Sequence, residues 1–204
     1  MRIRALVPTL RTVIRVAPHD EANAPHLPEG VLDFTAQRRQ EVDDHLVSGR
    51  TIAADDIAAY FHTGGTTGAP KLARHSHGAQ VFTAWVCVQL QGTLASDVVI
   101  NGYPLFHVAG VLPGALTSFA AGSEVVIPTT SLFRSREVLG NYWRLVERYG
   151  ATVVSAVPTV LEALANTPVG TADISTLRYC RTGAAPLSPD LAARFESLFG
   201  LHVH

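Results

Sequence analysis

The chain has 204 residues, a formal net charge of −1 and a hydrophobic content of 47%. A charge this close to zero argues against electrostatic binding to nucleic acid or to an acidic membrane surface, because both need a basic patch. The length fits one domain or part of a larger one. Charged residues make up 16%, which fits either a small apolar enzyme or a fragment whose surface further chain covers.

The cysteines and the apolar stretches indicate the cellular compartment of the protein and whether it spans a membrane. Cys87 and Cys180 form no CxxC pair and no zinc spacing, so we expect a reducing, cytoplasmic compartment. The arginines within Met1 to Val16 interrupt the apolar core that a signal peptide needs. Val98 to Ser123 carries no charge, but glycines and prolines break it up, which favours buried elements over a membrane span.

The first quarter of the chain predicts little regular structure. Leu10 to Val16 has the apolar character of a short strand, and the prolines of Ala17 to Gly30 indicate an irregular connector. Val31 to Ser48 is polar with weak helical character. We therefore divide the chain into an N-terminal connector segment, residues 1–55, and a second region, residues 56–204.

From Asp56 onward, short apolar runs alternate with helical patterns, which predicts an α/β fold with a mostly parallel sheet. Arg136 to Tyr149 shows the clearest amphipathic pattern and predicts one helix that ends at Gly150. Ser188, followed by Pro189, predicts the start of another helix. The expected strands are Ile57 to His62, Val98 to Ile100, Glu124 to Ile127, Thr152 to Val157, Leu177 to Arg181 and a final one from Leu201; further helices are expected over Gly78 to Thr93 and from Pro158.

The most specific motif follows the first of these strands and suits a phosphate ligand. Its glycines allow a tight turn in which backbone N–H groups approach an anion, its threonines add hydroxyl donors, and its lysine adds a compact positive charge. Lys71 is the only lysine among 16 basic residues. The spacing differs from a Walker A loop, GxxxxGK[ST]. The candidate nucleotide-binding residues are Thr63, Gly64, Gly65, Thr66, Thr67, Gly68 and Lys71.

Two further motifs follow in order. Tyr103 to Gly110 reads YPLFHVAG, where Phe106 could gate an apolar channel and His107 could donate a hydrogen bond to a carboxylate. Arg181 to Leu187 reads RTGAAPL, whose small residues allow a flat base to approach the backbone. His75 and His77 form an HxH pair, but nothing nearby completes a metal site, and we assign no metal ligand.

The stretch from Tyr60 to Lys71, YFHTGGTTGAPK, resembles the signature of the adenylate-forming superfamily, which includes acyl-CoA synthetases and peptide-synthetase adenylation domains. The usual form is T-S-G-T-T-G-x-P-K-G. Gly64 replaces the serine and Leu72 the final glycine, so one hydroxyl that could meet a phosphate is lost. The two later motifs resemble the P-x-F-H-x-x-G and G-[GA]-A-P-L elements of the same superfamily, and together the likeness spans Ile57 to His204.

The resemblance implies roles for the later motifs and a reaction for the longer relatives. Gly183, Ala184, Ala185 and Pro186 would border adenine, while Phe106, His107 and Pro158, within a V-P-T element, would border the acyl group, with His107 as the catalytic residue. A carboxylic acid would react with ATP, bound with Mg²⁺, to give an acyl-adenylate, and coenzyme A would then take the acyl group. Apolar predicted walls without a buried charge favour a fatty or other aliphatic acid.

Several alternatives stay open at this stage. The family's next motif, Y-G-x-T-E, is expected just beyond His204, so we expect a fragment of the large N-terminal domain that is inactive alone and works with missing N- and C-terminal parts. The rival hypotheses are a remnant that binds nucleotide without catalysis, an adenylation fragment that acts with a carrier protein, and an unstable remnant without function. Pyrophosphate exchange driven by an added acid would separate an enzyme from a protein that only binds nucleotide. Dependence of product formation on CoA rather than on a carrier protein would separate the two enzyme hypotheses.

Overall fold

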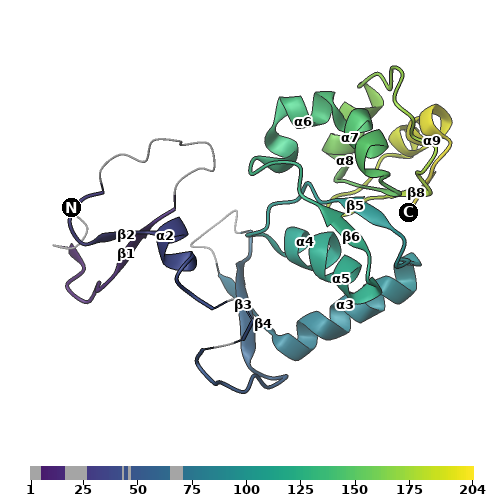
Figure 1. The fold of residues 1–204 in the computed structure, drawn as a ribbon. Coiled ribbons are helices and arrows are strands. Elements are labelled where there is room, and N and C mark those ends of the chain that lie inside the picture. The colour runs from purple at the N-terminus through teal and green to yellow at the C-terminus, as the bar shows by residue number, and fades with distance from the viewer. Residues whose placement is uncertain (1–5, 17–26, 43, 46, 65–70) are drawn as a thin grey trace. The chain divides into compact units, whose positions relative to one another are not determined.

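The computed structural model describes residues 6–16, 27–42, 44–45, 47–64 and 71–204, and the chain divides into two compact units, Met1–Thr51 and Ile52–His204 (Figure 1). In the first unit, strand β1 (Val13–Arg15) pairs in parallel with strand β2 (Val31–Asp33). The strand expected within residues 10–16 therefore forms. The weak helical pattern after it forms only helix α2 (Phe34–Arg38), which the Asp33 carboxylate caps by accepting from the N–H of Ala36 at 2.9 Å.

The second unit contains a five-stranded parallel sheet, which confirms the predicted α/β class. Its strands run in the order β6-β5-β7-β8-β9. Strand β5, in the interior of the sheet, pairs with β6 on one side and β7 on the other. The bounds are Val98–Ile100 for β5, Glu124–Val126 for β6, Val153–Ser155 for β7, Tyr179–Arg181 for β8 and His202–Val203 for β9.

Helices cover both faces of this sheet (Figure 1). On one face lie α3 (His77–Gln91), α4 (Val108–Val111), the π-helical turn η1 (Leu112–Leu116) and α5 (Thr117–Ala121). The other face carries α6 (Arg136–Gly140), α7 (Tyr142–Tyr149), α8 (Pro158–Ala165) and α9 (Pro189–Phe199), and the 3₁₀ turn η2 (Leu132–Arg134) leads into α6. The Ser188 hydroxyl accepts from the N–H of Leu191 at 3.1 Å, which confirms the predicted cap of α9.

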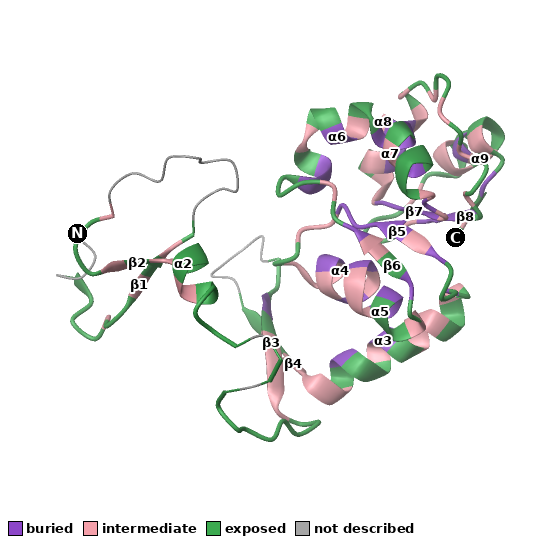
Figure 2. Ribbon diagram, in the orientation of Figure 1, coloured by how far each residue is buried: buried purple, intermediate pink, exposed green. Residues whose placement is uncertain are grey.

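The main core lies between the sheet and helices α7 to α9, and the sheet strands are among the most buried parts of the chain (Figure 2). Successive side chains of a strand point to opposite faces. Ile100, Val154 and Cys180 accordingly pack into the main core, while Val99, Val153 and Tyr179 form a second cluster on the opposite face. Burial raises the pKa of the Cys180 thiol to about 12, as expected for a thiol in apolar surroundings.

A buried carboxylate connects the amino ends of three strands. Asp97, 1% exposed, accepts from the N–H of Leu94, from the Thr152 hydroxyl at 2.7 Å and from the Arg178 guanidinium at 2.6 Å. Burial by itself would raise the pKa of Asp97, but these hydrogen bonds and the nearby charge of Arg178 outweigh it and hold the pKa below its usual value. The beginnings of β5, β7 and β8 are therefore held together around one negative charge.

Two elements differ from the sequence predictions. The single helix expected over 136–149 is broken at Asn141, whose side chain donates to the carbonyl of Glu137 at 3.0 Å and ends α6. An asparagine amide competes for backbone groups in this way, and the hydrophobic pattern alone does not reveal it. Strand β3 (Ile57–His62) forms as predicted, but it pairs antiparallel with β4 (Leu72–Ser76) in a separate hairpin and is only partly buried.

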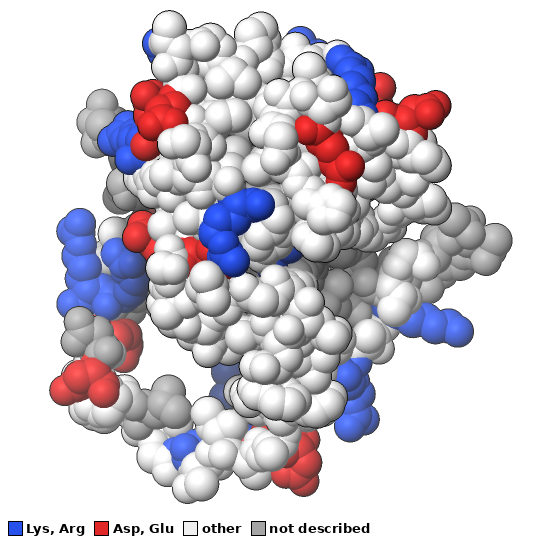
Figure 3. Space-filling model, turned by 90° about the vertical axis from the view of Figure 1, so that its right-hand side faces the viewer, with Lys and Arg blue, Asp and Glu red and all other residues white. Residues whose placement is uncertain are grey.

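The described surface is sparse in charge. On the face shown in Figure 3, the charged side chains form small groups, several of which contain both acidic and basic residues, and wide areas without charge separate these groups. Within the described ranges no helix is long and apolar enough to cross a membrane. The same residues contain no group of three or more His, Cys, Asp or Glu side chains that could hold a metal ion.

Candidate functional site

The loops that carry the two later motifs meet at one end of the parallel sheet. The segment with Tyr103 to Gly110 follows β5, Val157 follows β7, and Thr182 to Ala184 follow β8. The connection after β5 covers one face of the sheet and the connection after β7 covers the other (Figure 1). Open parallel sheets bind ligands in the crevice at such a switch point, outside the carboxyl ends of the strands.

Asn101, directly after β5, shapes the first of these loops. Its side chain is 1% exposed, donates to the Gly110 carbonyl at 3.0 Å and accepts from the Tyr103 N–H at 3.1 Å. A Cβ at Gly110 would stand well within 3.0 Å of the Pro104 carbonyl oxygen. The glycine of the motif is therefore required for close backbone approach, and Asn101 fixes both ends of the loop that presents His107.

His107 begins helix α4 as its N-cap, and this contact determines its tautomer. Its Nδ1 accepts a hydrogen bond from the N–H of Ala109 at 3.1 Å. Because a backbone nitrogen only donates, Nδ1 carries no proton, and the neutral ring bears its proton on Nε2. The imidazole is thus arranged to donate from Nε2 to an acceptor such as a carboxylate oxygen.

The base of the phosphate loop lies beside this histidine. The N–H and the hydroxyl of Thr63 both donate to the Lys71 carbonyl, at 2.8 and 3.2 Å, and close the loop at its base. The hydroxyl expected to face a phosphate therefore closes the loop in this structure. The rings of His62 and His107 meet edge to face with centroids 6.5 Å apart. Gly65, Thr66, Thr67 and Gly68 lie outside the described residues.

An apolar cavity of about 320 Å³ lies between His107 and the loop after β8. Its walls come from the loops after β5, β7 and β8 and from η2: Gly102, Tyr103, Pro104, His107, Ala109, Leu132, Phe133, Arg134, Val157, Val160 and Ala184. The Phe133 ring occupies the space beside Gly102, where a Cβ would stand well within 3.0 Å of it. The cavity thus presents a mostly apolar volume, and His107, Tyr103 and Arg134 are the lining side chains that can donate hydrogen bonds.

A smaller cavity of about 140 Å³ shares Tyr103, Ala109, Val157 and Ala184 with the first. Its other lining residues are mostly polar: Gln91, Pro113, Ser155, Arg181, Thr182 and Gly183. Burial raises the pKa of the Tyr103 phenol, although a hydrogen bond to Ser155 and the charge of Arg181 oppose this effect. One end of the site therefore contains a buried positive charge.

Backbone strain is present in the walls of the larger cavity. Leu132 and Ala184, at φ 54° and 68°, are the non-glycine residues with positive φ in the described part of the chain, and both line this cavity. Side chains with a Cβ adopt this conformation at a cost, and such residues gather at ligand sites. A Cβ at Gly183, by contrast, would meet no atom within 4 Å. The glycine leaves open space beside the smaller cavity.

Several predicted site residues lie away from the cavities. Phe106 is 67% exposed and lines neither, and Pro158 is the first residue of α8, where it supports a wall formed by its neighbours Val157 and Val160. Ala185 and Pro186 follow the lining residues of their motif and are exposed. The structure brings together His107, Gly183 and Ala184, with the base of the phosphate loop close by.

Two lining or supporting residues had no assigned role in the sequence interpretation. Asn101 is a polar residue directly after a buried strand, in a stretch without charged residues. A polar residue at such a place indicates a hydrogen-bonding role at the end of the strand. Arg181 lies at the start of a motif and at the end of a predicted strand, and neither position indicates a buried charge. The assumption that the walls lack a buried charge does not hold, because Arg181 is 7% exposed and lines the smaller cavity.

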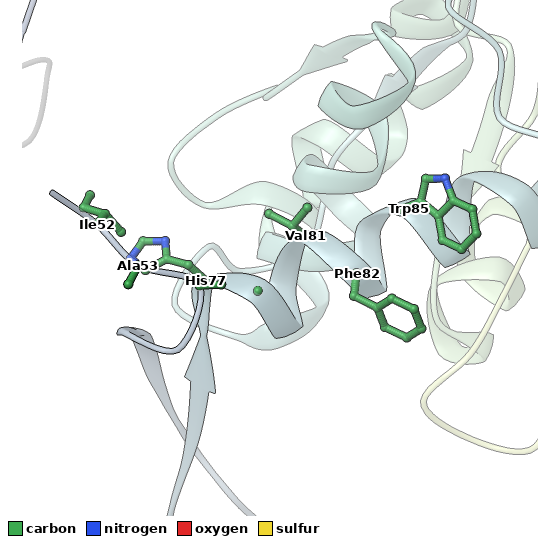
Figure 4. Close-up of a pocket in the computed structure, with 8 residues that line it drawn as sticks. Ile52, Ala53, His77, Val81, Phe82 and Trp85 are labelled. Carbon is green, nitrogen blue, oxygen red and sulfur yellow. The ribbon is translucent and has the colours of Figure 1, made fainter.

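A separate groove of about 520 Å³ runs along helix α3, lined by Ile52, Ala53, Ala54, His77, Gly78, Val81, Phe82 and Trp85 (Figure 4). Trp85 is 57% exposed. The side of helix α3 that carries Val81 and Trp85 therefore faces outward in the described chain. The groove contains none of the predicted site residues and stands apart from the two cavities.

Comparison with known proteins identifies a family and relatives of this chain. The profile of the AMP-binding enzyme family matches residues 4–204. The marinolic acid–CoA ligase of Pseudoalteromonas sp. is 32% identical over 180 residues, which cover 86% of this chain and 28% of that protein. The oxalate–CoA ligase of Arabidopsis thaliana is 33% identical over 156 residues, which cover 73% of this chain and 29% of that protein.

A solved structure reproduces the fold over almost the whole chain. The anthranilate CoA ligase AuaEII, crystallised with anthranoyl-AMP, superimposes with a TM-score of 0.80 at 24% identity, over 99% of this chain and 37% of that one. This chain thus spans about a third of the length of such proteins. With the family profile matched over nearly every residue, the chain belongs to the AMP-binding enzyme family, the adenylate-forming enzymes that its motifs resemble.

Proposed function

We propose that this chain is part of an enzyme that activates an aliphatic carboxylic acid with ATP and transfers its acyl group to coenzyme A. The observation that carries the proposal is the convergence on His107. The base of the phosphate loop lies beside this residue, and an apolar cavity opens next to its imidazole. The two relatives described above, in which about a third of the aligned residues are identical to this chain, are CoA ligases named for different acids.

The chemistry divides into two steps. In the first, a carboxylate oxygen forms a bond to the α-phosphorus of ATP and the bond from that phosphorus to the bridging oxygen breaks, so that pyrophosphate leaves. In the second, the thiolate of coenzyme A bonds to the acyl carbon and AMP leaves with the electron pair of the acyl–oxygen bond. Both steps depend on alignment of the reacting groups and on stabilisation of charge on the phosphates.

The described residues contribute positioning to the first step. The Nε2–H of His107 would hold one carboxylate oxygen, and Lys71, an exposed side chain at the end of the loop, would contribute positive charge to the phosphates. Gly183 and Ala184 would leave room for the base. Magnesium would neutralise charge on bound ATP. The described residues contain no group of three or more His, Cys, Asp or Glu side chains that could hold this ion.

Thermal unfolding of the purified chain with and without magnesium–ATP tests nucleotide binding. Ligand at about 100 times its dissociation constant stabilises a folded binder by about 2.7 kcal/mol. We expect ATP to raise the melting temperature of the wild type and not of Lys71→Ala. Arg74→Ala, which removes a positive charge three residues away on the same hairpin, should keep the response. Acid-dependent exchange of pyrophosphate into ATP then tests catalysis, and absence of any ATP response would refute the proposal for this chain.

A further inference from the structure

Arg181 is the buried charge of the site, and its hydrogen bonds all go to neutral groups. Its Nε donates to the Ser155 hydroxyl at 2.9 Å, Nη2 donates to the Pro113 carbonyl at 2.9 Å, and Nη1 donates to Gln91 Oε1. A guanidinium has five N–H donors. One N–H on each Nη is therefore without a hydrogen-bond partner among the described residues.

No carboxylate of the described residues lies within salt-bridge distance of this guanidinium. Arginine stays charged inside proteins, and a buried charge is costly unless an opposite charge accompanies it. Arg178, three residues earlier in the chain, shows the contrasting arrangement, because the buried Asp97 carboxylate pairs with it. Arg181 therefore differs from a structural ion pair in lacking its counter-charge.

Thr182, the residue next to Arg181, carries a second unsatisfied polar group. The Thr182 Oγ1 is buried and has no hydrogen-bond partner among the described residues. Both residues line the cavity of about 140 Å³, and this cavity shares a wall with the apolar cavity that His107 lines. A donor for one carboxylate thus lines the larger cavity, and a buried positive charge lines the smaller one, next to a residue whose buried hydroxyl has no partner among the described residues.

We propose that Arg181 is a specificity-determining residue that selects an acid with a second anionic group, so that the substrate is an aliphatic dicarboxylate. One carboxylate would meet Nε2 of His107 and react, while the second would accept from Arg181 and the Thr182 hydroxyl. Arginine suits this task because its planar donors match a carboxylate. The inference rests on the proposed function, which it deepens by naming the substrate class.

Calorimetric titration of the whole chain with matched acids tests the selectivity directly. Adipate and hexanoate, and glutarate and pentanoate, differ within each pair by the second carboxylate alone. We expect the dicarboxylate of at least one pair to bind about 10-fold more tightly or better, as is typical of a hydrogen-bonded charge pair in a buried site. Arg181→Met should remove the difference in affinity within each pair, while Arg181→Lys should keep part of it.

A second variant keeps the test valid should Arg181→Met fail to fold. Thr182→Val removes only a hydroxyl that has no partner, so the variant should fold at least as well as the wild type and bind the dicarboxylate several-fold more weakly. Four results would each overturn the inference: equal affinity for both acids of each pair, a preference that survives Arg181→Met, unchanged dicarboxylate affinity in Thr182→Val, or binding of neither acid. Tighter binding of a matched acid with a neutral hydroxyl in place of the second carboxylate would overturn it as well.

The magnesium–ATP response separates this inference from the proposed function. A dicarboxylate preference without any ATP response would refute the ligase proposal while the acid site stands. A normal ATP response without the preference would refute the selectivity assigned to Arg181 while the ligase proposal stands.

Discussion

Nδ1 of His107 accepts the N–H of Ala109, so one imidazole both begins a helix and directs its proton outward from Nε2. Asparagine can replace the first role without the second, because its side-chain oxygen also caps helices. His107→Asn should therefore change the free energy of unfolding by no more than a few tenths of a kcal/mol, whereas His107→Ala should lower it by about 1 kcal/mol.

The same pair of variants separates structure from chemistry. Both lose the Nε2 donor, and we expect acid-dependent pyrophosphate exchange to fall by about 10-fold or more in each, the usual range for a hydrogen bond to a charged group. Urea unfolding and exchange are measured on the same preparations. Exchange that falls in His107→Ala but stays unchanged in His107→Asn would show that the histidine acts only as a helix cap.

Gly64 stands where the superfamily carries serine, and the local structure has room for that serine. A Cβ at this position would meet no atom within 4 Å, and no positive φ demands glycine there. Gly64→Ser should thus leave stability unchanged within about 0.5 kcal/mol. The added hydroxyl should tighten magnesium–ATP binding by about 2- to 10-fold, the gain of one ordinary hydrogen bond. Gly64→Ala is the control, and an equal gain with alanine would contradict a role for the hydroxyl.

Asp97 should make the folded state sensitive to acid. Because its pKa is held below the usual value in the folded chain, the carboxylate stabilises the fold above its unfolded pKa of about 3.9. That contribution is lost as the pH falls through the lower, folded pKa. Asp97→Asn should reduce stability near neutral pH by about 1–3 kcal/mol and flatten the dependence below about pH 4.

Denaturant unfolding between pH 3 and pH 7 measures this dependence. Asp55→Asn, which removes an exposed carboxylate, serves as the control and should keep the wild-type profile. A profile for Asp97→Asn that stays parallel to the wild type throughout would mean that other carboxylates cause the acid sensitivity.

Ala184 carries local strain that glycine would relieve. Its φ of 68° lies in the left-handed region, which costs a residue with a Cβ about 1–2 kcal/mol. Ala184→Gly should raise the free energy of unfolding by about 0.5–1 kcal/mol after the greater flexibility of glycine in the unfolded chain is included. Ala163→Gly, inside helix α8, should lower it by about 0.5–1 kcal/mol. Destabilisation of similar size in both variants would contradict the strain.

The sequence predicted the parallel sheet because its strands are short, apolar and separated by clear helical patterns. Val98 to Ile100 and the cap at Ser188 illustrate signals that lie within a few neighbouring residues. The pairing of β3 with β4 was not predicted, since apolar and polar residues alternate only weakly over Leu72 to Ser76. The break at Asn141 depends on one side-chain hydrogen bond.

The site was predictable in its motifs and less so in its walls. His107 and Gly183 could be named because particular chemistry requires those residue types in those patterns. The sequence does not distinguish a buried arginine such as Arg181 from an exposed one. Only the packing of α3, η1 and β7 around its side chain shows that the charge is buried. The roles of Phe106 and Pro158 rested on neighbours in sequence, and the lining residues turned out to be Val157 and Val160.

The contact between Gly102 and the Phe133 ring links the size of the apolar cavity to two positions at once. A side chain at 102 would occupy the volume that the ring fills, so these positions share a fixed amount of space. Shrinking Phe133 alone would enlarge the cavity, while a larger residue at 102 would be tolerated only beside a smaller one at 133. A redesign of the shape of this cavity should therefore change the two residues together.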